Sequence, residues 1–297
     1  MPFNKTAVNY ATSYQQALAQ AYPYVLYFAD LYKTENDNRY RWINAKTIAI
    51  PVLDVAGRKD NNRDTITAAA RNYNNSWENK TLENERTWST LVHPEDIDET
   101  NFAVTIQNIT QVMNEEQKFP EKDRYLISKI YADYTAASKA ADTTAVTSEN
   151  ILTLFDAQME AMTNARVPKS GRIWYMTTSM NRILKSAITR YIANGDENIR
   201  RIIASIDDVK IVEIPTDIMW TVFDFTEGSV KGSGAKQINW LLVHPSAVIT
   251  PEKYSFASLD QPSALTQGKY YYYEEAHEDV FVLNRRIDAI QFSVSAT

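Results

Sequence analysis

Apolar residues recur along this chain with helical spacing in some stretches and as strand-like runs in others. Spacing of four across Tyr10, Tyr14 and Leu18 predicts a short amphipathic helix near the N-terminus. Pro23 interrupts this pattern, so residues 1–44 are expected to form an arm of short pieces. The apolar side of such an arm must pack on something else.

The sequence after the arm predicts a long β-ribbon with an outgoing and a returning strand. Its outgoing arm, KTIAIPVLDV, is rich in β-branched residues, and AGRKDNNRDT is turn-like. ITAAARNYNNSWENKTL then leads back toward ERTWSTLV. A ribbon of this kind has too few apolar residues for a core of its own, so it should be ordered by contact with the body or with another subunit. A disordered insertion is the alternative.

Two helices are predicted next. Apolar residues at offsets of four, three and four mark a long helix from Asp98 to Gln117: Phe102, Ile106, Ile109 and Met113. Pro120 suits the first position of a second helix. The inner face of that helix carries Leu126, Ile127, Ile130, Tyr131 and Tyr134.

Helices and strands alternate after the small-residue stretch AASKAADTTAVTS, which marks the best domain boundary. Ser148 is expected to cap a helix. RIWYMT then reads as a buried strand, SMNRILKSAITRYI as a helix capped by Ser179, and VKIVEIP and INWLLVHP as further strands. TEGSVKGSGAKQ should be an exposed, mobile loop. The pattern predicts a compact α/β or α+β domain over residues 148–260, followed by two strand-like runs in the tail.

Composition excludes several classes of protein. The 297 residues are 44% apolar and 11% aromatic, enough to bury a core. A net charge of -6 without blocks of like charge argues against a dedicated nucleic-acid binder. The absence of cysteine excludes disulfides, thiolate metal sites and cysteine nucleophiles. Neither a signal peptide nor an apolar run of about 18 residues is present, so an untargeted, soluble cytoplasmic product without a membrane partner is expected.

Histidine beside acids raises the question of a metal or acid/base centre. In RTWSTLVHPEDIDETN, His93 precedes a group of carboxylates: Glu95, Asp96, Asp98 and Glu99. His277 likewise precedes Glu278 and Asp279. Neither forms the H-E-x-x-H spacing of a zinc protease, and adjacent strand residues point to opposite faces. We expect no metal site at either place.

The stretch around His93 is better interpreted as a junction. Trp88, Leu91 and Val92 would anchor the returning arm of the ribbon, and Pro94 would end that strand. The acids would then place negative charge at the N-terminal end of the long helix, where the helix dipole favours it. His93 becomes a boundary residue.

Other catalytic and binding motifs are also absent. The glycine loop at Gly228, Gly232, Gly234 and Lys236 fits neither a Walker loop nor the dinucleotide pattern. No G-x-S-x-G elbow occurs, and Ser89 and Ser246, which lie near histidines, have no recognisable acid partner. The arginine pairs at 200–201 and 285–286 are expected to form ion pairs between elements or subunits. The eighteen tyrosines suit extensive interfaces. We therefore expect no catalytic residues, no cofactor and no enzymatic activity.

The order of these elements resembles the major capsid proteins of tailed bacteriophages, which have the Hong Kong 97 fold. The stretches that carry the resemblance are AKTIAIPVL, NERTWSTLVHPEDIDETN, FPEKDRYLISKI, ILTLFDAQMEAMTNARVP, IRRIIASIDDVKIVEIP, INWLLVHPSAVI and AHEDVFVLNRRIDAI. Together they span nearly the whole chain.

The resemblance implies an α+β capsid fold with named parts. An N-terminal arm would cover residues 1–44, an extended β-hairpin E-loop 45–90, a peripheral domain with the long spine helix 91–147, and an axial α/β domain 148–260. The strands in 261–297 would return to the peripheral domain.

The resemblance also implies a function. The family's subunits assemble into hexamers and pentamers of an icosahedral shell around double-stranded DNA, with each E-loop over a neighbour. Expected partners are further copies of the chain, a separate scaffolding protein or none, portal and head decoration or completion proteins, and DNA contacted non-specifically. The expected location is the virion, assembled in the host cytoplasm.

Some family members cross-link an E-loop lysine to an asparagine of the peripheral domain. Lys59 and Asn284 can be imagined in that role, although no motif here supports it. The alternatives to a phage head are an encapsulin-like compartment shell with the same fold and a metal-dependent hydrolase that uses His93 or His277.

Overall fold

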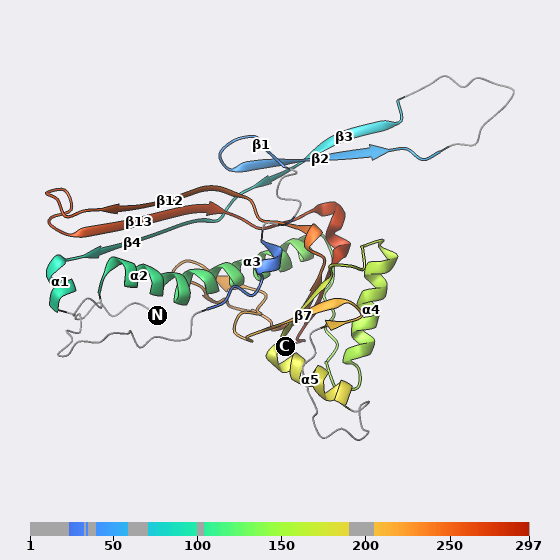
Figure 1. Ribbon diagram of the computed structural model, residues 1–297. Helices are drawn as coiled ribbons and strands as arrows, with labels where there is room; N and C mark the ends of the chain where they lie inside the picture. The colour runs from blue at the N-terminus through green and yellow to red at the C-terminus, as the bar shows by residue number, and fades with distance from the viewer. Residues whose placement is uncertain are drawn as a thin grey trace.

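A computed structural model describes residues 24–32, 34, 40–58, 71–99, 104–189 and 205–296. The described chain mixes helices and strands, which confirms the α+β class. A long helix and a three-stranded sheet form one arm of the molecule, a five-stranded sheet with two helices forms the other, and a β-ribbon projects away from both (Figure 1). The expected helix at Tyr10, Tyr14 and Leu18 lies outside the described residues.

The five-stranded sheet holds most of the core. Its strand order is β15 (Ile290–Val294), β10 (Ile238–Val243), β5 (Ile173–Thr177), β7 (Val209–Ile214) and β6 (Ser205–Ile206). Strands β5 and β7 are parallel, and the other pairs are antiparallel. Every residue of β5 and β10 is buried, as expected from their continuous apolar sequences. The three strands expected in RIWYMT, VKIVEIP and INWLLVHP are confirmed.

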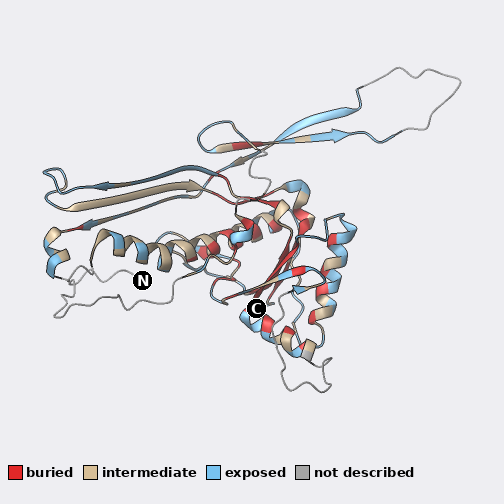
Figure 2. Ribbon diagram, in the orientation of Figure 1, coloured by how far each residue is buried: buried red, intermediate tan, exposed pale blue. Residues whose placement is uncertain are grey.

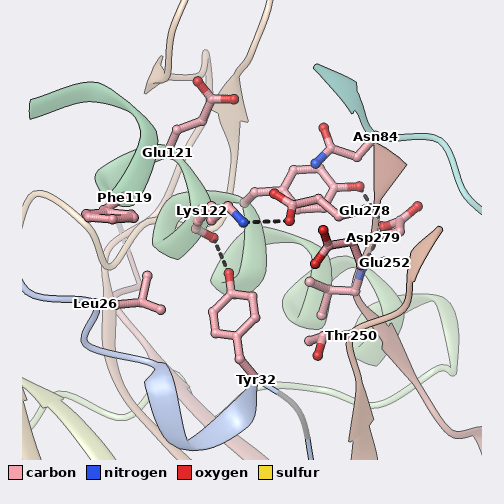
Figure 3. Close-up of a pocket in the computed structure, with 12 residues that line it drawn as sticks. Leu26, Tyr32, Asn84, Phe119, Glu121, Lys122, Thr250, Glu252, Glu278 and Asp279 are labelled. Carbon is pink, nitrogen blue, oxygen red and sulfur yellow. Dashed lines mark hydrogen bonds and ion pairs between the residues drawn. The ribbon is translucent and has the colours of Figure 1, made fainter. Parts of the chain in front are cut away.

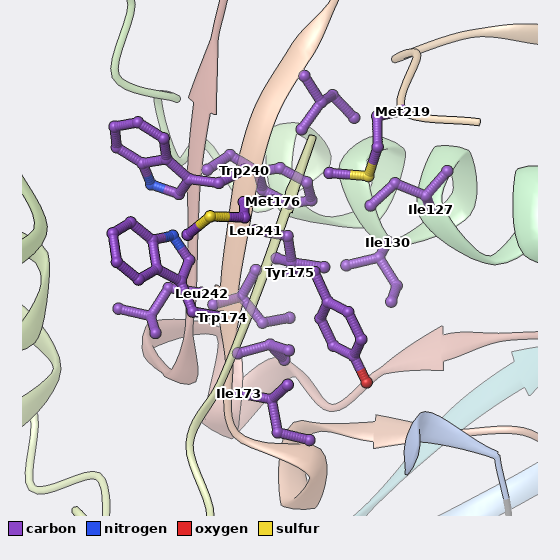
Figure 4. Packing of buried hydrophobic residues seen from close by; sticks show 14 of the residues in the cluster. Ile127, Ile130, Ile173, Trp174, Tyr175, Met176, Met219, Trp240, Leu241 and Leu242 are labelled. Carbon is purple, nitrogen blue, oxygen red and sulfur yellow. The ribbon is translucent and has the colours of Figure 1, made fainter. Parts of the chain in front are cut away.

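Helices cover both faces of this sheet. Helix α4 (Ile151–Asn164) packs on the face with the tryptophans, where Phe155 stacks on Trp174 at 4.4 Å. Figure 4 shows Trp174 and Trp240 on one side of the sheet, and Tyr175 with the α3 residues Ile127 and Ile130 on the other. Each large apolar side chain buried in this way contributes about 1.5 to 3 kcal/mol.

Two expected helix caps are wrong. Helix α5 (Thr178–Thr189) begins one residue before Ser179, and the hydroxyl of Thr177 accepts from the Met180 amide at 3.4 Å. Helix α4 begins at Ile151 after Asn150, whose side chain instead accepts from the Thr147 amide. In both places a neighbouring polar residue, and not the expected serine, directly precedes the first residue of the helix.

The long helix runs without a break from residue 106 to residue 136. It consists of α2 (Ile106–Met113), a π-helical turn (Asn114–Lys118) and α3 (Phe119–Ala136). The predicted start at Asp98 is wrong, because Thr105 caps the helix by accepting from the Asn108 amide at 3.2 Å. Asp98 belongs to a separate short helix, α1 (Pro94–Glu99).

Pro120 continues this helical run instead of beginning a separate helix. It lies near the start of α3, directly after the π turn, where the Phe119 amide donates to the Asn114 carbonyl. Proline lacks a backbone N–H and its ring crowds the carbonyl four residues earlier. The wider π turn accommodates both defects, so the helix passes through the proline.

The three-stranded sheet lies along the long helix (Figure 1). Its order is β12 (Glu252–Asp260), β13 (Tyr270–Glu278) and β4 (Glu85–Val92), all antiparallel. ERTWSTLV is therefore a strand, but it pairs with β13 instead of returning along the ribbon. Pairing with a strand so distant along the chain leaves no local signal in the sequence.

The ribbon has its own small sheet of β1 (Arg41–Trp42), β2 (Thr47–Val55) and β3 (Tyr73–Thr81). The predicted ribbon of antiparallel strands is confirmed for the described residues on both arms. Its foot packs on β11 (Val248–Ile249) and β14 (Phe281–Val282) through a small apolar cluster that includes Ile48 and Leu82. Figure 2 shows burial at this foot and exposure along the projecting part.

The expected division at residue 260 does not follow the sheets. Strand β12 ends at that residue and pairs with β13 across a hairpin, so both belong to the sheet along the helix. The last strand, β15, pairs with β10 in the central sheet. Strands β12 and β13 are consecutive along the chain, which favours their antiparallel pairing, whereas the apolar alternation of β15 matches the buried face of β10.

The remaining short elements connect these layers. They are three short 3₁₀ helices at Ala29–Leu31, Pro245–Ala247 and Asn284–Ala289, and the hairpin of β8 (Phe223–Asp224) and β9 (Val230–Lys231). Arg86 and Arg124 donate to carbonyls of Phe225 and Ser229 in this hairpin at 2.6 and 2.9 Å. The expected mobile loop TEGSVKGSGAKQ is thus tied to β4 and α3.

Candidate assembly surfaces

One face of the ribbon is apolar and has no covering chain among the described residues. The pairing register places Pro51 opposite Trp77, Leu53 opposite Asn75 and Val55 opposite Tyr73, all on one face. Leu53, Val55, Tyr73 and Trp77 are 61%, 65%, 54% and 52% exposed. We call these residues with Pro51 the ribbon face. Apolar groups gathered on a two-stranded projection are typical of a surface that another chain covers.

The opposite face of the ribbon is directed toward the part of the subunit that contains β11 and the 3₁₀ helix Asn284–Ala289. Ile50 and Val52 line a groove of about 520 Å³ together with Ile249, Leu283 and the arginines at 285 and 286, and Pro51 and Leu53 also border it. Arg285 forms an ion pair with Asp54 of the ribbon. One of the two expected arginine pairs thus bridges elements, and the other, at 200–201, lies outside the described residues.

Only one of the two residues imagined for a cross-link is described. Lys59 lies outside the described residues. The side-chain oxygen of Asn284 accepts from Lys80 at 3.1 Å, and Lys80 also pairs with Glu78 at 3.2 Å. Asn284 therefore takes part in fixing the ribbon foot within one subunit.

Ion pairs hold the three-stranded sheet to the long helix. Lys118 pairs with Glu274 at 3.0 Å, and Lys122 pairs with Glu278 at 2.6 Å. Arg86 of β4 reaches Glu121 at 2.6 Å. These pairs occupy the face of the sheet toward the helix, so alternate residues of β13, such as Glu275 and His277, lie on the outer face.

The segment before the first 3₁₀ helix is docked on α3 by a buried carboxylate. Asp123 accepts from the Tyr24 hydroxyl at 2.7 Å and from the Tyr27 amide at 2.8 Å. Burial raises the pKa of Asp123 to about 6, against these hydrogen bonds, which favour the charged form. Burial and the nearby Asp123 charge raise the pKa of Tyr24 in turn. The end of the expected arm is therefore tied to the long helix.

A cavity of about 250 Å³ lies beside this docking point. Figure 3 shows the Tyr32 hydroxyl donating to the Lys122 carbonyl at 3.0 Å and Lys122 reaching Glu278. Tyr125 donates to Asp279 at 2.7 Å. The polar groups named at this cavity are paired with one another and connect the arm, the helix and β13.

His93 is a boundary residue, as the sequence suggests. It follows β4, and its Nδ1 accepts from the Glu95 amide at 3.2 Å at the start of α1. Pro94 follows the end of the strand. Asp98 and Glu99 are in the last turn of α1, so the expected stabilisation of the long helix by these acids is wrong.

His244 and Ser246 contact each other at the end of β10. His244 Nδ1 lies 2.8 Å from the Ser246 hydroxyl, and its Nε2 lies 3.1 Å from the Ser170 carbonyl. Ser89 lies within β4, opposite Tyr273.

His277 has different neighbours from those that the sequence suggests. Glu278 and Asp279 turn to Lys122 and Tyr125, while His277 meets Glu275 and Glu85. In the sequence, only the adjacent acids Glu278 and Asp279 suggest a site at His277. The missed signal is the spacing of two along a strand, which puts Glu275 and His277 on one face.

The glycines of the expected loop serve backbone packing. A Cβ at Gly232 would lie 2.7 Å from the Val222 side chain, and Gly228 and Gly234 have positive φ angles. Within the described residues, no helix is both long and apolar enough to cross a bilayer.

None of the known protein-family models matches the chain, and no curated protein is similar to it in sequence. Solved structures are similar over nearly its full length. A chain of the mature capsid of bacteriophage PhiM1 has a TM-score of 0.69 at 11% identity, covering 97% of this chain and 93% of that one. A chain of the cyanophage P-SCSP1u capsid gives 0.67 at 11% identity, with the same coverage. One of Mycobacterium phage Che8 gives 0.65 at 16% identity, covering 98% of both chains.

This chain has a bacteriophage capsid fold. Near-complete coverage in both directions means that the ribbon, the long helix and both sheets recur together in these structures, and are not additions to an unrelated domain. The resemblance seen in the sequence is confirmed at the level of the fold.

Proposed function

We propose that this chain is the structural major capsid protein of a tailed bacteriophage. Its subunits would assemble into hexamers and pentamers of an icosahedral head that encloses double-stranded DNA. The observation that carries the proposal is the ribbon face, an apolar surface on a projection that no described residue of the same subunit covers. The capsid fold over the whole chain supports the same function.

The parts of the subunit would divide the work of assembly. Residues 1–44 would be the N-terminal arm and 45–90 the E-loop, whose ribbon face would lie on a neighbouring subunit. The peripheral part would contain the long helix, and the axial part would be built on the five-stranded sheet. Repetition of one heterologous contact closes a ring, and rings of this kind build a shell.

The proposed role is structural and not enzymatic. A net charge of -6 suits a wall that touches packaged DNA non-specifically better than a protein that binds DNA tightly. Partners would be other copies of the chain, portal and head decoration or completion proteins, and a scaffolding protein. The mature protein would belong to the virion, after assembly in the host cytoplasm.

Expression followed by sedimentation and electron microscopy tests the proposal. Closed shells or ring-shaped capsomers are expected, with or without a co-expressed scaffolding protein. A compact monomer at every concentration would contradict it. Shells that enclose a host enzyme and no DNA, when made beside their native neighbouring genes, would instead show an encapsulin-like compartment.

A further inference from the structure

Three side chains of metal-binding type converge on the outer face of the three-stranded sheet. Glu275 and His277 are two residues apart on β13, and Glu85 of β4 lies directly opposite His277 in the pairing register. The Nε2 atom of His277 is 2.7 Å from Glu85 Oε1 and 3.2 Å from Glu275 Oε1. Strand periodicity and register, not a sequence motif, bring them together.

Neighbouring groups hold each of these ligands in position. Lys46 donates to the second carboxylate oxygen of Glu85 at 2.8 Å, and the Tyr273 hydroxyl donates to that of Glu275 at 2.7 Å. The Tyr254 ring lies edge-on to the imidazole, with 5.8 Å between ring centres. Each carboxylate therefore directs its remaining oxygen at the imidazole, an arrangement that outer groups commonly impose on metal ligands.

The hydrogen-bonding capacity of the cluster is unbalanced. A neutral imidazole offers at most one proton at Nε2, yet two carboxylate oxygens face that atom. A divalent cation in place of the proton would satisfy both oxygens and the nitrogen lone pair at once. The side chains of His277 and Glu275 are mostly buried, at 17% and 24% exposure, which limits competition from water.

We propose that Glu85, Glu275 and His277 bind a divalent transition-metal ion, with Zn²⁺ as the best match. One imidazole nitrogen and two carboxylate oxygens are ligands that Zn²⁺ accepts, with water completing a tetrahedron. Bonds of about 2.0 to 2.2 Å place neighbouring tetrahedral ligands about 3.3 Å apart. The 3.2 Å between His277 Nε2 and Glu275 Oε1 already fits this separation. The 2.7 Å between His277 Nε2 and Glu85 Oε1 is too short, so the half-exposed Glu85 side chain would move away by about 0.6 Å.

The bound ion would act on the junction between ribbon and body. It would link β4 to β13 close to residues 82–84, where the chain passes from the ribbon into β4. Lys46, which precedes β2, already joins Glu85 across this junction. The metal would therefore stiffen the point from which the ribbon projects. The site stands on contacts within one subunit and does not depend on the proposed function.

The site is tested by measuring zinc binding to the full chain. The protein is first stripped of metal with a chelator and is purified in whatever assembly state it adopts. Titration with Zn²⁺ against a chromophoric chelator should show one ion per chain, and Co²⁺ should give the visible absorption of a four-coordinate ion. His277→Gln and Glu275→Gln should each abolish the Co²⁺ spectrum. Tyr273→Phe should weaken binding about 10-fold.

His93→Gln is the matched control, because His93 is a histidine beside a glutamate outside the cluster. It should bind Zn²⁺ like the wild type. Absence of stoichiometric binding by the wild type would overturn the proposal, as would unchanged binding in Glu275→Gln, whose amide keeps the shape of the side chain. Zinc binding by Glu275→Gln therefore tests the proposal even if His277→Gln does not fold.

Discussion

The hydroxyl of Tyr24 donates a 2.7 Å hydrogen bond to the buried carboxylate of Asp123, ninety-nine positions later in the chain. The Tyr27 and Phe28 amides donate to the same carboxylate, and Phe28 packs on Tyr175 of the central sheet. One acidic side chain thus anchors the end of the arm segment to the long helix. Its burial makes this anchor sensitive to pH.

Stability should increase as the Asp123 carboxylate takes up a proton. Its pKa is raised by burial to about 6 from 3.8, so its contribution is fully present below pH 3.8 and is lost as the pH rises through about 6. A difference of about two pKa units corresponds to about 3 kcal/mol at most. Denaturation between pH 4.5 and 7.5 should show this rise toward low pH in the wild type.

The Asp123→Asn variant isolates that contribution. The amide cannot titrate, so the difference in unfolding free energy between wild type and variant should change through the window around pH 6. An identical pH dependence in the two proteins, compared in the same assembly state, would show that Asp123 is not the group responsible.

Loss of the buried guanidinium of Arg172 should destabilise the subunit by about 2 to 4 kcal/mol. This side chain donates to the Val167 and Pro168 carbonyls at 2.8 and 2.9 Å, and also to Met159 and Thr163 near the end of α4. Arg172→Met would leave those carbonyls without donors. Arg182→Met, at an exposed position on α5, is the control and should unfold like the wild type.

The acids of α1 should differ in their response to charge reversal. Asp98 and Glu99 occupy its last turn, where lysine complements the helix dipole, whereas Glu95 is in the first turn. Asp98→Lys/Glu99→Lys should therefore leave thermal stability unchanged or slightly raised. Glu95→Lys should lower it by about 0.3 to 1 kcal/mol. Equal losses in both variants would mean that the acids of this junction act in some other way.

The ion pair between Lys122 and Glu278 should couple the long helix to β13. Both side chains are about one quarter exposed, so a coupling energy of about 0.5 to 1 kcal/mol is expected. A double-mutant cycle with Lys122→Gln and Glu278→Gln measures it from unfolding curves. The coupling energy should decrease in high salt. A coupling energy near zero at low salt would show that the ion pair does not contribute to stability.

Local patterns in the sequence predict the buried elements well and the pairing between distant strands poorly. Strands β5 and β10 were recognisable because every residue is apolar or small enough to be buried. Polar and apolar residues alternate along β4 as they do in a strand of the ribbon, and nothing in ERTWSTLV indicates that its partner is β13. The passage of the helix through Pro120 likewise depends on a π turn that no residue pattern announces.

The candidate surfaces show the same limit. The sequence predicts a ribbon that needs a partner, and the register adds which residues form its apolar face. The cluster at His277 escaped notice because it combines a spacing of two on one strand with a residue from another. Its neighbours in sequence, Glu278 and Asp279, are engaged elsewhere.

The ribbon face is expected to be a contact between subunits. Sedimentation and electron microscopy of Leu53→Glu/Trp77→Glu test it most directly, with Leu53→Met/Trp77→Phe as the matched variant that keeps the face apolar. The charged variant should fold with the wild-type circular dichroism spectrum but form no closed shells, while the apolar variant should assemble normally. Shells formed by the charged variant in wild-type yield would show that the ribbon face is not a contact between subunits.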